Sequence, residues 1–326
     1  MPETRPTDLM RAMAEAARLA QRAPSVFNTQ PWHWRVASRS LDLLSDPERR
    51  LTVTDPAGRQ LLLSCGAALH HARLGLEAGG RLITVTRFPD RASPDLLAHI
   101  EVQGHAEPDA QVRRLRGAIP QRRTDRRAFA ATPVPAEAIE RLTGAARDEA
   151  TDLYLVPDEK VPVLAEAAAA AAAAERADPA YRRSLAEWTN RPAETGDGVP
   201  PRTAVEAGPR RVPVRDFATE GESGLSVGAG DDTGAVYAVL YGAADGPADW
   251  LRAGEAVSAV LLTAVVEKLA VAPMSDVLEV AEPRRRVGGL LPHGRPYLVL
   301  RIGVPVGGDA TPPTPRRSAE AVIRYV

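Results

Sequence analysis

The stretch RAPSVFNTQPWHWRV, residues 22–36, combines prolines, polar side chains and tryptophans in one short segment. Pro24 and Pro31 restrict the backbone on both sides of the polar residues, because the proline ring fixes φ. The polar residues are Ser25, Asn28 and Gln30. A side-chain amide presents a donor beside an acceptor, so a loop held in this way can bind the edge of a flat heterocycle, with the tryptophans as walls. The alternative is a proline-rich entry to a strand, in which the serine and asparagine cap a turn.

A second polar cluster, QRRTDRRAF at residues 121–129, concentrates arginines around a threonine. The cations repel one another unless an anion lies among them, and a guanidinium binds phosphate through two parallel hydrogen bonds. The cluster therefore predicts a phosphate site, and a solvated basic loop fits the pattern equally well. The cluster contains four arginines, Arg122, Arg123, Arg126 and Arg127, with the hydroxyl of Thr124 between them. The late segment TPPTPRRSAE adds Arg316 and Arg317 as a second candidate pair.

The composition is that of a soluble globular protein. The chain has 326 residues, of which 44% are hydrophobic and 25% charged, and this length fits one large or two closely packed domains. No apolar run approaches the roughly 20 residues that span a bilayer, and the amphipathic start lacks the apolar stretch of a signal peptide. We therefore expect a cytoplasmic protein without a membrane segment. The net charge of −1 argues against a nucleic acid as partner.

Several other patterns are excluded by their context. The sequence GLSVG, residues 224–228, matches the nucleophile elbow of hydrolases, but glycine-rich sequence surrounds it where a strand and a helix are needed. The nearby GAGDDTG leads into a predicted strand, so it is not a dinucleotide-binding loop. His70 and His71 are adjacent instead of four positions apart, and Cys65 is the sole cysteine. We expect neither a metal site nor an intrachain disulfide.

Two long apolar helices, predicted at residues 58–78 and 248–270, resemble each other. Without gaps, LSCGAALHHARLGL from residue 63 aligns with LRAGEAVSAVLLTA from residue 251, which pairs Gly66 with Gly254. An apolar strand is predicted after each helix. Matches among small residues also arise by chance, but the shared order indicates two related halves.

The predicted halves are residues 1–118 and residues 119–326. The second half contains an alanine-rich helix predicted near residues 162–187, followed by a glycine- and proline-rich segment at residues 190–233. A segment of this length without periodicity is usually either functional or disordered.

The separated motifs together resemble one known family. Residues 24–32 follow the PSxxNxQPW motif of the FMN-dependent nitroreductases, and RRTDRRAF is similar to the RRSxRxF motif of that family. The surroundings DPAGRQLLLSCGAALHHARLGL and LRIGVP are similar to the Acg-type branch. The similarity covers nearly the whole chain.

The resemblance implies an α+β, nitroreductase-like fold, in which two related halves form a pseudo-dimer with central antiparallel sheets flanked by helices. In the family, one subunit supplies the arginine motif and the other supplies the PSxxN loop. Here the first half carries only the loop and the second half only the arginines, which implies one composite FMN site per chain. The chain would then be a monomer or a homodimer.

The resemblance also implies roles for single residues. The implied cofactor-binding residues are Pro24, Ser25, Asn28, Gln30, Arg122, Arg123, Thr124, Arg126, Pro273, Met274, Ser275, Arg316 and Arg317. The family often has Glu-Gly after the proline of the late loop, so Met274 and Ser275 put that contact in doubt. No side chain is expected to act as a catalytic acid or base, because the flavin carries the chemistry.

The implied activity is NAD(P)H-dependent reduction of nitroaromatic, quinone or similar acceptors, with hydride passing through flavin N5. The partners would be a nicotinamide nucleotide and a small-molecule acceptor. The alternative is an FMN-sequestering protein, in which residues 190–233 form a lid that closes the site and leaves little turnover. A related protein without flavin is a third interpretation, in which the arginine clusters are solvated loops.

Overall fold

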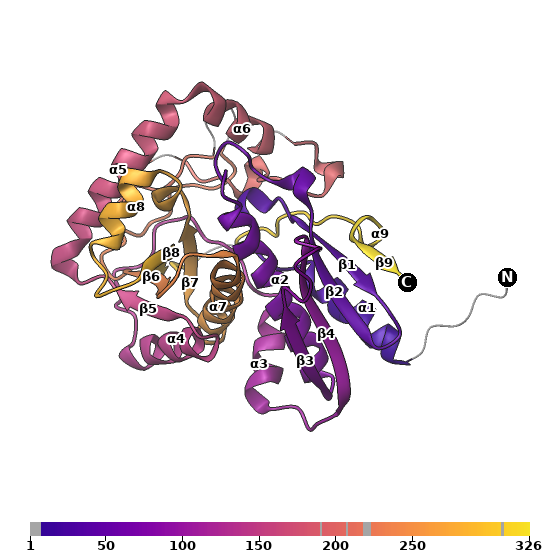
Figure 1. Ribbon diagram of the computed structural model, residues 1–326. Coiled ribbons are helices and arrows are strands. Elements are labelled where there is room, and N and C mark those ends of the chain that lie inside the picture. The colour runs from indigo at the N-terminus through magenta and orange to yellow at the C-terminus, as the bar shows by residue number, and fades with distance from the viewer. Residues whose placement is uncertain (1–7, 190, 207, 218–222, 308–309) are drawn as a thin grey trace.

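The computed structural model describes residues 8–189, 191–206, 208–217, 223–307 and 310–326. Two sheets lie on either side of a central pair of helices (Figure 1). The helices are α1 (Asp8–Ala20), α2 (Arg59–Ala78), α3 (Ala110–Ala118), α4 (Ala136–Asp148), α5 (Val161–Ala177), α6 (Pro179–Thr189), α7 (Pro247–Val266), α8 (Ala281–Gly288) and α9 (Ala319–Val322). The two long helices α2 and α7 form the central pair.

The first sheet has the strand order β3-β4-β2-β1-β9. Its strands are β1 (Trp32–Val36), β2 (Ser40–Ser45), β3 (Arg81–Arg87), β4 (Leu96–His105) and β9 (Ile323–Tyr325). Side chains alternate between the two faces of a strand, and Trp32, Trp34 and Val36 of β1 are accordingly buried on one face. The tryptophans of the opening stretch therefore belong to the core, together with residues of α1 and α2.

The second sheet has the strand order β5-β6-β8-β7. Its strands are β5 (Asp152–Leu155), β6 (Val236–Gly242), β7 (Ala270–Met274) and β8 (Arg295–Gly303). The central strand β8 is buried along almost its whole length, as expected for a strand that is covered on both faces.

The two halves of the chain repeat one order of elements. The series α1-β1-β2-α2-β3-β4 corresponds to α4-β5-β6-α7-β7-β8 when the extra helices α5, α6 and α8 are set aside. The order β3-β4-β2-β1 of the first sheet corresponds to β7-β8-β6-β5 of the second, and all these pairings are antiparallel. The α+β fold with antiparallel sheets is confirmed, while a duplication and the boundary at residue 118 stay predictions.

The last strand crosses from the second half to the first. Residues 310–318 lead to β9, which adds to the edge of the first sheet, parallel to β1 (Figure 1). The sequence suggested only a proline-rich tail here. This strand has three residues, and its partner lies almost 290 positions earlier, so no local pattern marks it.

The predicted alanine-rich helix is two helices. Helix α5 ends at Ala177, Asp178 is extended with ψ of 112°, and α6 begins at Pro179. A residue before proline is disfavoured in the helical conformation, which explains the break. Beyond α6, the described part of residues 190–233 contains only short 3-10 turns and one isolated bridge.

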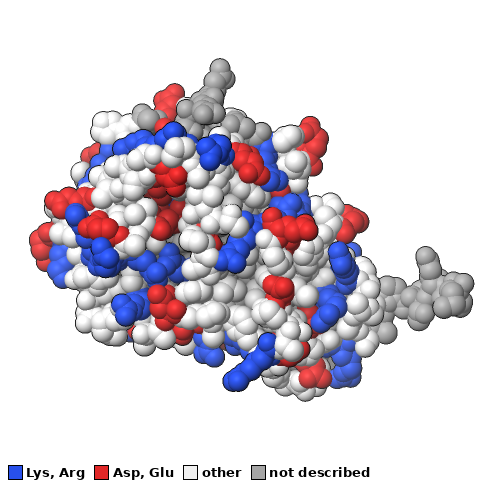
Figure 2. Space-filling model, turned by 45° about the horizontal axis from the view of Figure 1, so that its top comes forward, with Lys and Arg blue, Asp and Glu red and all other residues white. Residues whose placement is uncertain are grey.

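The described ranges contain no helix that is both long and apolar enough to cross a membrane. The same ranges contain no group of histidine, cysteine, aspartate and glutamate side chains suited to a metal ion. Cations and carboxylates are interspersed over the face drawn in Figure 2, in keeping with the net charge of −1.

Candidate functional site

The loop before β1 has an unusual backbone conformation. Phe27, Asn28 and Gln30 have φ angles of 47°, 55° and 50°, in the left-handed region that residues other than glycine rarely adopt. The Ser25 hydroxyl accepts a hydrogen bond from the Gln30 N–H at 2.9 Å, which closes the turn. Each such residue costs about 1–3 kcal/mol of strain, so the surrounding contacts must hold the loop in place.

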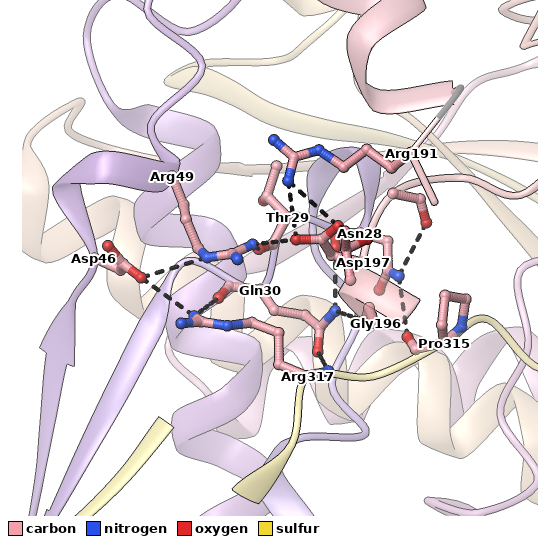
Figure 3. Close-up of polar contacts among 12 residues, drawn as sticks. Asn28, Thr29, Gln30, Asp46, Arg49, Arg191, Gly196, Asp197, Pro315 and Arg317 are labelled. Atoms are coloured by element: carbon pink, nitrogen blue, oxygen red, sulfur yellow. Dashed lines mark hydrogen bonds and ion pairs between the residues drawn. The ribbon is translucent and has the colours of Figure 1, made fainter. Parts of the chain in front are cut away.

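Asn28 supplies part of that support. Its Nδ2 donates to the carbonyl oxygens of Gly198 at 3.0 Å and Pro315 at 3.1 Å, and its Oδ1 accepts from Arg316 at 3.1 Å. Both donor hydrogens and the acceptor of the amide are thus used within the protein, and Figure 3 shows the contact with Pro315. Asn28 therefore connects its own loop with the segment around Gly198 and with the segment of Pro315 and Arg316.

Gln30 supplies the remaining contacts that hold this loop in place, and it is fully buried. Its Nε2 donates to the Gly196 carbonyl oxygen at 2.9 Å, and its Oε1 accepts from the Arg317 N–H at 2.9 Å. The guanidinium of Arg317 donates a hydrogen bond to the Gln30 carbonyl oxygen at 3.0 Å. It also forms an ion pair with Asp46 at 3.2 Å (Figure 3). Burial raises the pKa of Asp46, but the hydrogen bond with His33 and the nearby guanidiniums of Arg317 and Arg49 outweigh it, so the pKa of Asp46 is lowered.

A cavity of about 460 Å³, which we call the basic cavity, opens beside this loop. Its wall comes from the end of α1, from the loop, from the segment after α3 and from residues 311–317. Seven arginines line it, and no Asp or Glu does among the residues that the structure describes. These arginines are Arg18, Arg22, Arg122, Arg123, Arg126, Arg316 and Arg317. Loops from both halves therefore meet at one strongly positive wall.

Most of this positive charge has no counter-charge within the described protein. Arg317 is paired with Asp46, but the other six arginines form no ion pair with any described residue. Burial and the neighbouring guanidiniums lower the pKa of Arg316 to about 9, and burial and Arg123 lower that of Arg122 to about 10. Nε and Nη1 of Arg122 are buried without a hydrogen-bond partner. An anion in the cavity would relieve both the desolvation and the repulsion.

A smaller cavity of about 100 Å³, which we call the apolar cavity, adjoins the basic one. The two share Pro24, Ser25, Thr124 and Arg126 in their walls. The remaining wall is largely apolar and includes Phe27, Leu63, Ala67, Phe217, Val257, Pro273 and Leu298. The Nε2 of Gln60, which also lines this cavity, is buried without a partner. The combined shape is a positive compartment joined to a narrow apolar one.

The described part of residues 190–233 covers part of both cavities. Val199 and Thr203 line the basic cavity, and Arg215 and Phe217 line the apolar cavity. The Phe217 ring meets the Phe27 ring edge-on at 6.0 Å, and the Arg126 guanidinium lies 4.4 Å from the Phe217 ring centre. The segment is therefore a fixed part of the wall in this structure.

One ion pair fastens the start of this segment to the loop after β2, and a second lies within the segment. The buried Asp197 carboxylate pairs with Arg49 at 2.6 Å and with Arg191 at 3.3 Å (Figure 3). Further along, Arg215 pairs with Glu279 at 2.7 Å and with Glu175 at 3.3 Å. Burial and the nearby carboxylates of Asp276 and Glu279 raise the pKa of Glu175 to about 7, despite Arg215.

The structure brings most of the residues singled out in the sequence to these cavities. Pro24, Ser25, Asn28, Arg122, Arg123, Thr124, Arg126, Arg316 and Arg317 line the basic cavity, and Pro273 and Ser275 line the apolar cavity. Gln30 and Met274 line neither. Met274 is buried in the core beside Val277 and Val299, and Gln30 ties loops together.

Other cavity residues had no signal in the sequence. Arg18, Gln21 and Arg22 come from the end of α1, where they resemble any exposed helix face. Gln60 and Ser64 lie on the first turns of α2. Arg215 and Phe217 lie in the segment without periodicity, so only the folded structure places them at the cavity.

Three comparisons place these features among known proteins. No family model matches the chain. The curated "Putative NAD(P)H nitroreductase Rv3131" of Mycobacterium tuberculosis is 40% identical over 311 residues, which are 94% of this chain and 89% of the relative. The "Putative NAD(P)H nitroreductase acg" of the same species is 34% identical over 329 residues, 99% and 98% of the two chains. A nitroreductase from Desulfitobacterium hafniense, solved with bound FMN, aligns with a TM-score of 0.40 and 14% identity over 65% of this chain and 98% of its own.

Proposed function

The chain belongs to the nitroreductase family, in its Acg-type branch, and from this premise we propose that it binds FMN and reduces small acceptors with NAD(P)H. The observation that carries the proposal is the pair of adjoining cavities: a compartment lined by seven arginines without a carboxylate, next to a narrow apolar compartment. A phosphorylated flavin has the same division, since an anionic phosphate ends a polar chain that is attached to a flat ring.

The residues that line the two cavities fit this cofactor. Arg122, Arg123 and Arg316 would hold the phosphate by charge-assisted hydrogen bonds, with Arg22 nearby. Pro24, Ser25, Thr124, Pro273 and Ser275 border the apolar cavity and would flank the ring. FMN, when bound, supplies the hydride chemistry between the nicotinamide nucleotide and the acceptor. The protein's part is to bind and orient the ring and to exclude water from it.

Gln60 adds a residue that the sequence did not indicate. Its buried Nε2 has no partner in the described structure and lines the apolar cavity. An unsatisfied buried donor costs about 1–3 kcal/mol, so a carbonyl oxygen on the bound ring would satisfy it.

The proposal is tested by titrating the apoprotein with FMN and following the quenching of flavin fluorescence. Arg316→Gln removes one guanidinium from the basic cavity and should weaken FMN binding by about 10- to 100-fold, the equivalent of about 1.5–3 kcal/mol for a charged hydrogen bond. Arg324→Gln is the matched control, because Arg324 lies exposed on β9 outside the cavity. Equal FMN affinity in both variants would contradict the phosphate assignment.

A second candidate function, flavin sequestration, is favoured by residues 190–233. This segment lines both cavities and is fastened by Asp197 and Arg215. A lid fixed in this way would keep the nicotinamide from the ring. Steady-state oxidation of NADPH by the FMN-loaded protein, with a nitroaromatic acceptor present, separates the two functions. Turnover supports the reductase, whereas tight FMN binding without turnover supports sequestration.

A further inference from the structure

The basic cavity holds more positive charge than FMN requires. Six of its arginines have no ion pair with a described residue. A phosphate monoester carries a charge of about −1.5 to −2 at neutral pH. About four guanidiniums are therefore left without a counter-charge after an FMN phosphate binds. A cluster of this kind fits a ligand with further phosphate.

A basic groove continues from the cavity along the surface. It has a volume of about 880 Å³ and lies between α1, the end of α2 and α3. Arg18 and Arg22 line both the groove and the basic cavity. The groove adds the side chains of Arg11, Arg81, Arg113 and Arg116, against only two carboxylates, those of Asp8 and Glu15. The excess of positive charge thus extends outward from the phosphate end of the site.

The groove also offers surfaces for a flat group. Small residues line part of it: Ala12, Ala16, Gly75, Ala78 and Gly79. A guanidinium stacks readily on a planar aromatic ring. The combination of small side chains with flanking arginines suits a nucleobase that lies against the groove wall and is covered by a guanidinium.

Not all of the groove arginines are committed to other contacts. Arg11 pairs with Asp8, Arg113 pairs with Glu107, and Arg81 contacts His105. Arg116, on the last turn of α3, makes no ion pair or side-chain hydrogen bond with any residue in the described ranges. Arg116 is therefore a cation of the groove that is available to an anionic ligand.

We propose that the groove is a second binding subsite, which takes the phosphate and adenine of an adenosine nucleotide next to the flavin phosphate. This inference rests on the proposed function, because the groove is defined by its junction with the FMN cavity. The adenosine phosphate has two chemically equivalent sources. It is either the second half of FAD, continuous with the flavin, or a separate nucleotide that binds beside FMN.

The test compares three probes on the full chain: FMN and FAD titrated into the apoprotein, and ADP titrated into the FMN-loaded protein by calorimetry. If the nucleotide belongs to the flavin, FAD should bind about tenfold more tightly than FMN. If the nucleotide is separate, FAD should show no advantage, and ADP should bind to the FMN-loaded protein in a one-to-one ratio.

The variant Arg116→Gln tests whether the nucleotide binds in the groove. It should reduce the FAD advantage or the ADP affinity by about fivefold or more and leave the FMN affinity within a factor of two. Arg114→Gln is the matched control, since Arg114 lies on the same helix but does not line the groove. Arg114→Gln should change none of the three affinities.

Two results would overturn the inference. One is an FAD affinity no greater than that of FMN together with no ADP binding. The other is nucleotide binding that Arg116→Gln and Arg114→Gln affect equally. A protein that binds ADP but neither flavin would contradict the proposed function and leave the groove as an independent nucleotide site, so the two failures are distinguishable.

Discussion

Gly66 and Gly254 lie against each other where α2 crosses α7, and each meets the backbone of the opposite helix. An ideal Cβ on Gly66 would lie 2.0 Å from the Leu251 carbonyl oxygen, and one on Gly254 would lie 2.1 Å from the Leu63 carbonyl oxygen. The contact is reciprocal, as across a two-fold axis. The ungapped alignment that paired these glycines in the sequence therefore pairs residues in equivalent positions.

Gly66→Ala should destabilise the protein strongly, because no side chain can move aside for a backbone atom. We expect a loss of about 3 kcal/mol in the free energy of unfolding, measured by urea denaturation. Gly117→Ala is the control: Gly117 lies within α3 with open space around it, and alanine there should stabilise by about 0.5–1 kcal/mol. Equal effects of the two substitutions would contradict the close helix crossing.

The same alignment relates two residues of the apolar cavity to two residues elsewhere in the chain. Ala67 and Ser275 line the apolar cavity, and a shift of 188 positions, the spacing of Gly66 and Gly254, relates them to Glu255 and Arg87. The buried Glu255 carboxylate pairs with the partly buried Arg87 at 2.7 Å and also with Arg73 at 2.8 Å. Glu255 and Arg87, which bind each other, thus stand at the positions that align with the small residues Ala67 and Ser275 of the apolar cavity.

Glu255→Ala should therefore cost about 3 kcal/mol of stability, because it leaves the Arg87 guanidinium without its buried partner and leaves Arg73 with Glu149 alone. The FMN:protein ratio should not change, since Glu255 lines neither cavity. The exposed pair of Glu282 and Arg286 provides the control, and Glu282→Ala should change stability by less than about 0.5 kcal/mol. A loss of FMN in Glu255→Ala protein that is still folded would contradict this assignment.

Asp197→Ala should loosen residues 190–233 over the cavities. It removes the acceptor of Arg49 and Arg191, together with a 2.8 Å hydrogen bond from Thr195. Loss of one charged hydrogen bond is worth about 1.5–3 kcal/mol, so FMN should dissociate about tenfold faster or more in stopped-flow measurements. Glu206→Ala, an exposed change in the same segment, should leave the rate as it is. An unchanged rate for Asp197→Ala would mean that the segment does not retain the flavin.

Glu175 should make stability depend on pH. Burial raises its folded-state pKa from 4.5 to about 7, so the folded protein binds an extra proton between these values. The contribution of Glu175 to stability is complete below about pH 4.5 and is lost as the pH rises to about 7. Glu175→Gln removes this titration, and wild-type stability relative to the variant should fall from pH 5 to pH 8 in urea denaturation. A constant difference across this range would contradict the raised pKa.

The sequence predicted the helices best, because α2 and α7 are long and continuously apolar. It also indicated the arginine cluster and the proline-rich loop, since rigid backbone and repeated charge are local properties. It could not show that Gln30 binds the Gly196 carbonyl and the Arg317 N–H, because those partners are separated from it by more than 160 residues. The positions of β9, Phe217 and Gln60 likewise depend on contacts with other parts of the chain, which no local sequence pattern shows.

The central claim, an FMN site that works with NAD(P)H, is tested most directly by one titration. The visible spectrum of the FMN-reconstituted protein is recorded under anaerobic conditions while NADPH is added in steps. The account predicts that the oxidised flavin band bleaches by the time one equivalent of NADPH is present. A protein-bound flavin that stays oxidised with excess NADPH, yet is bleached by dithionite, would contradict the reductase and leave sequestration as the function.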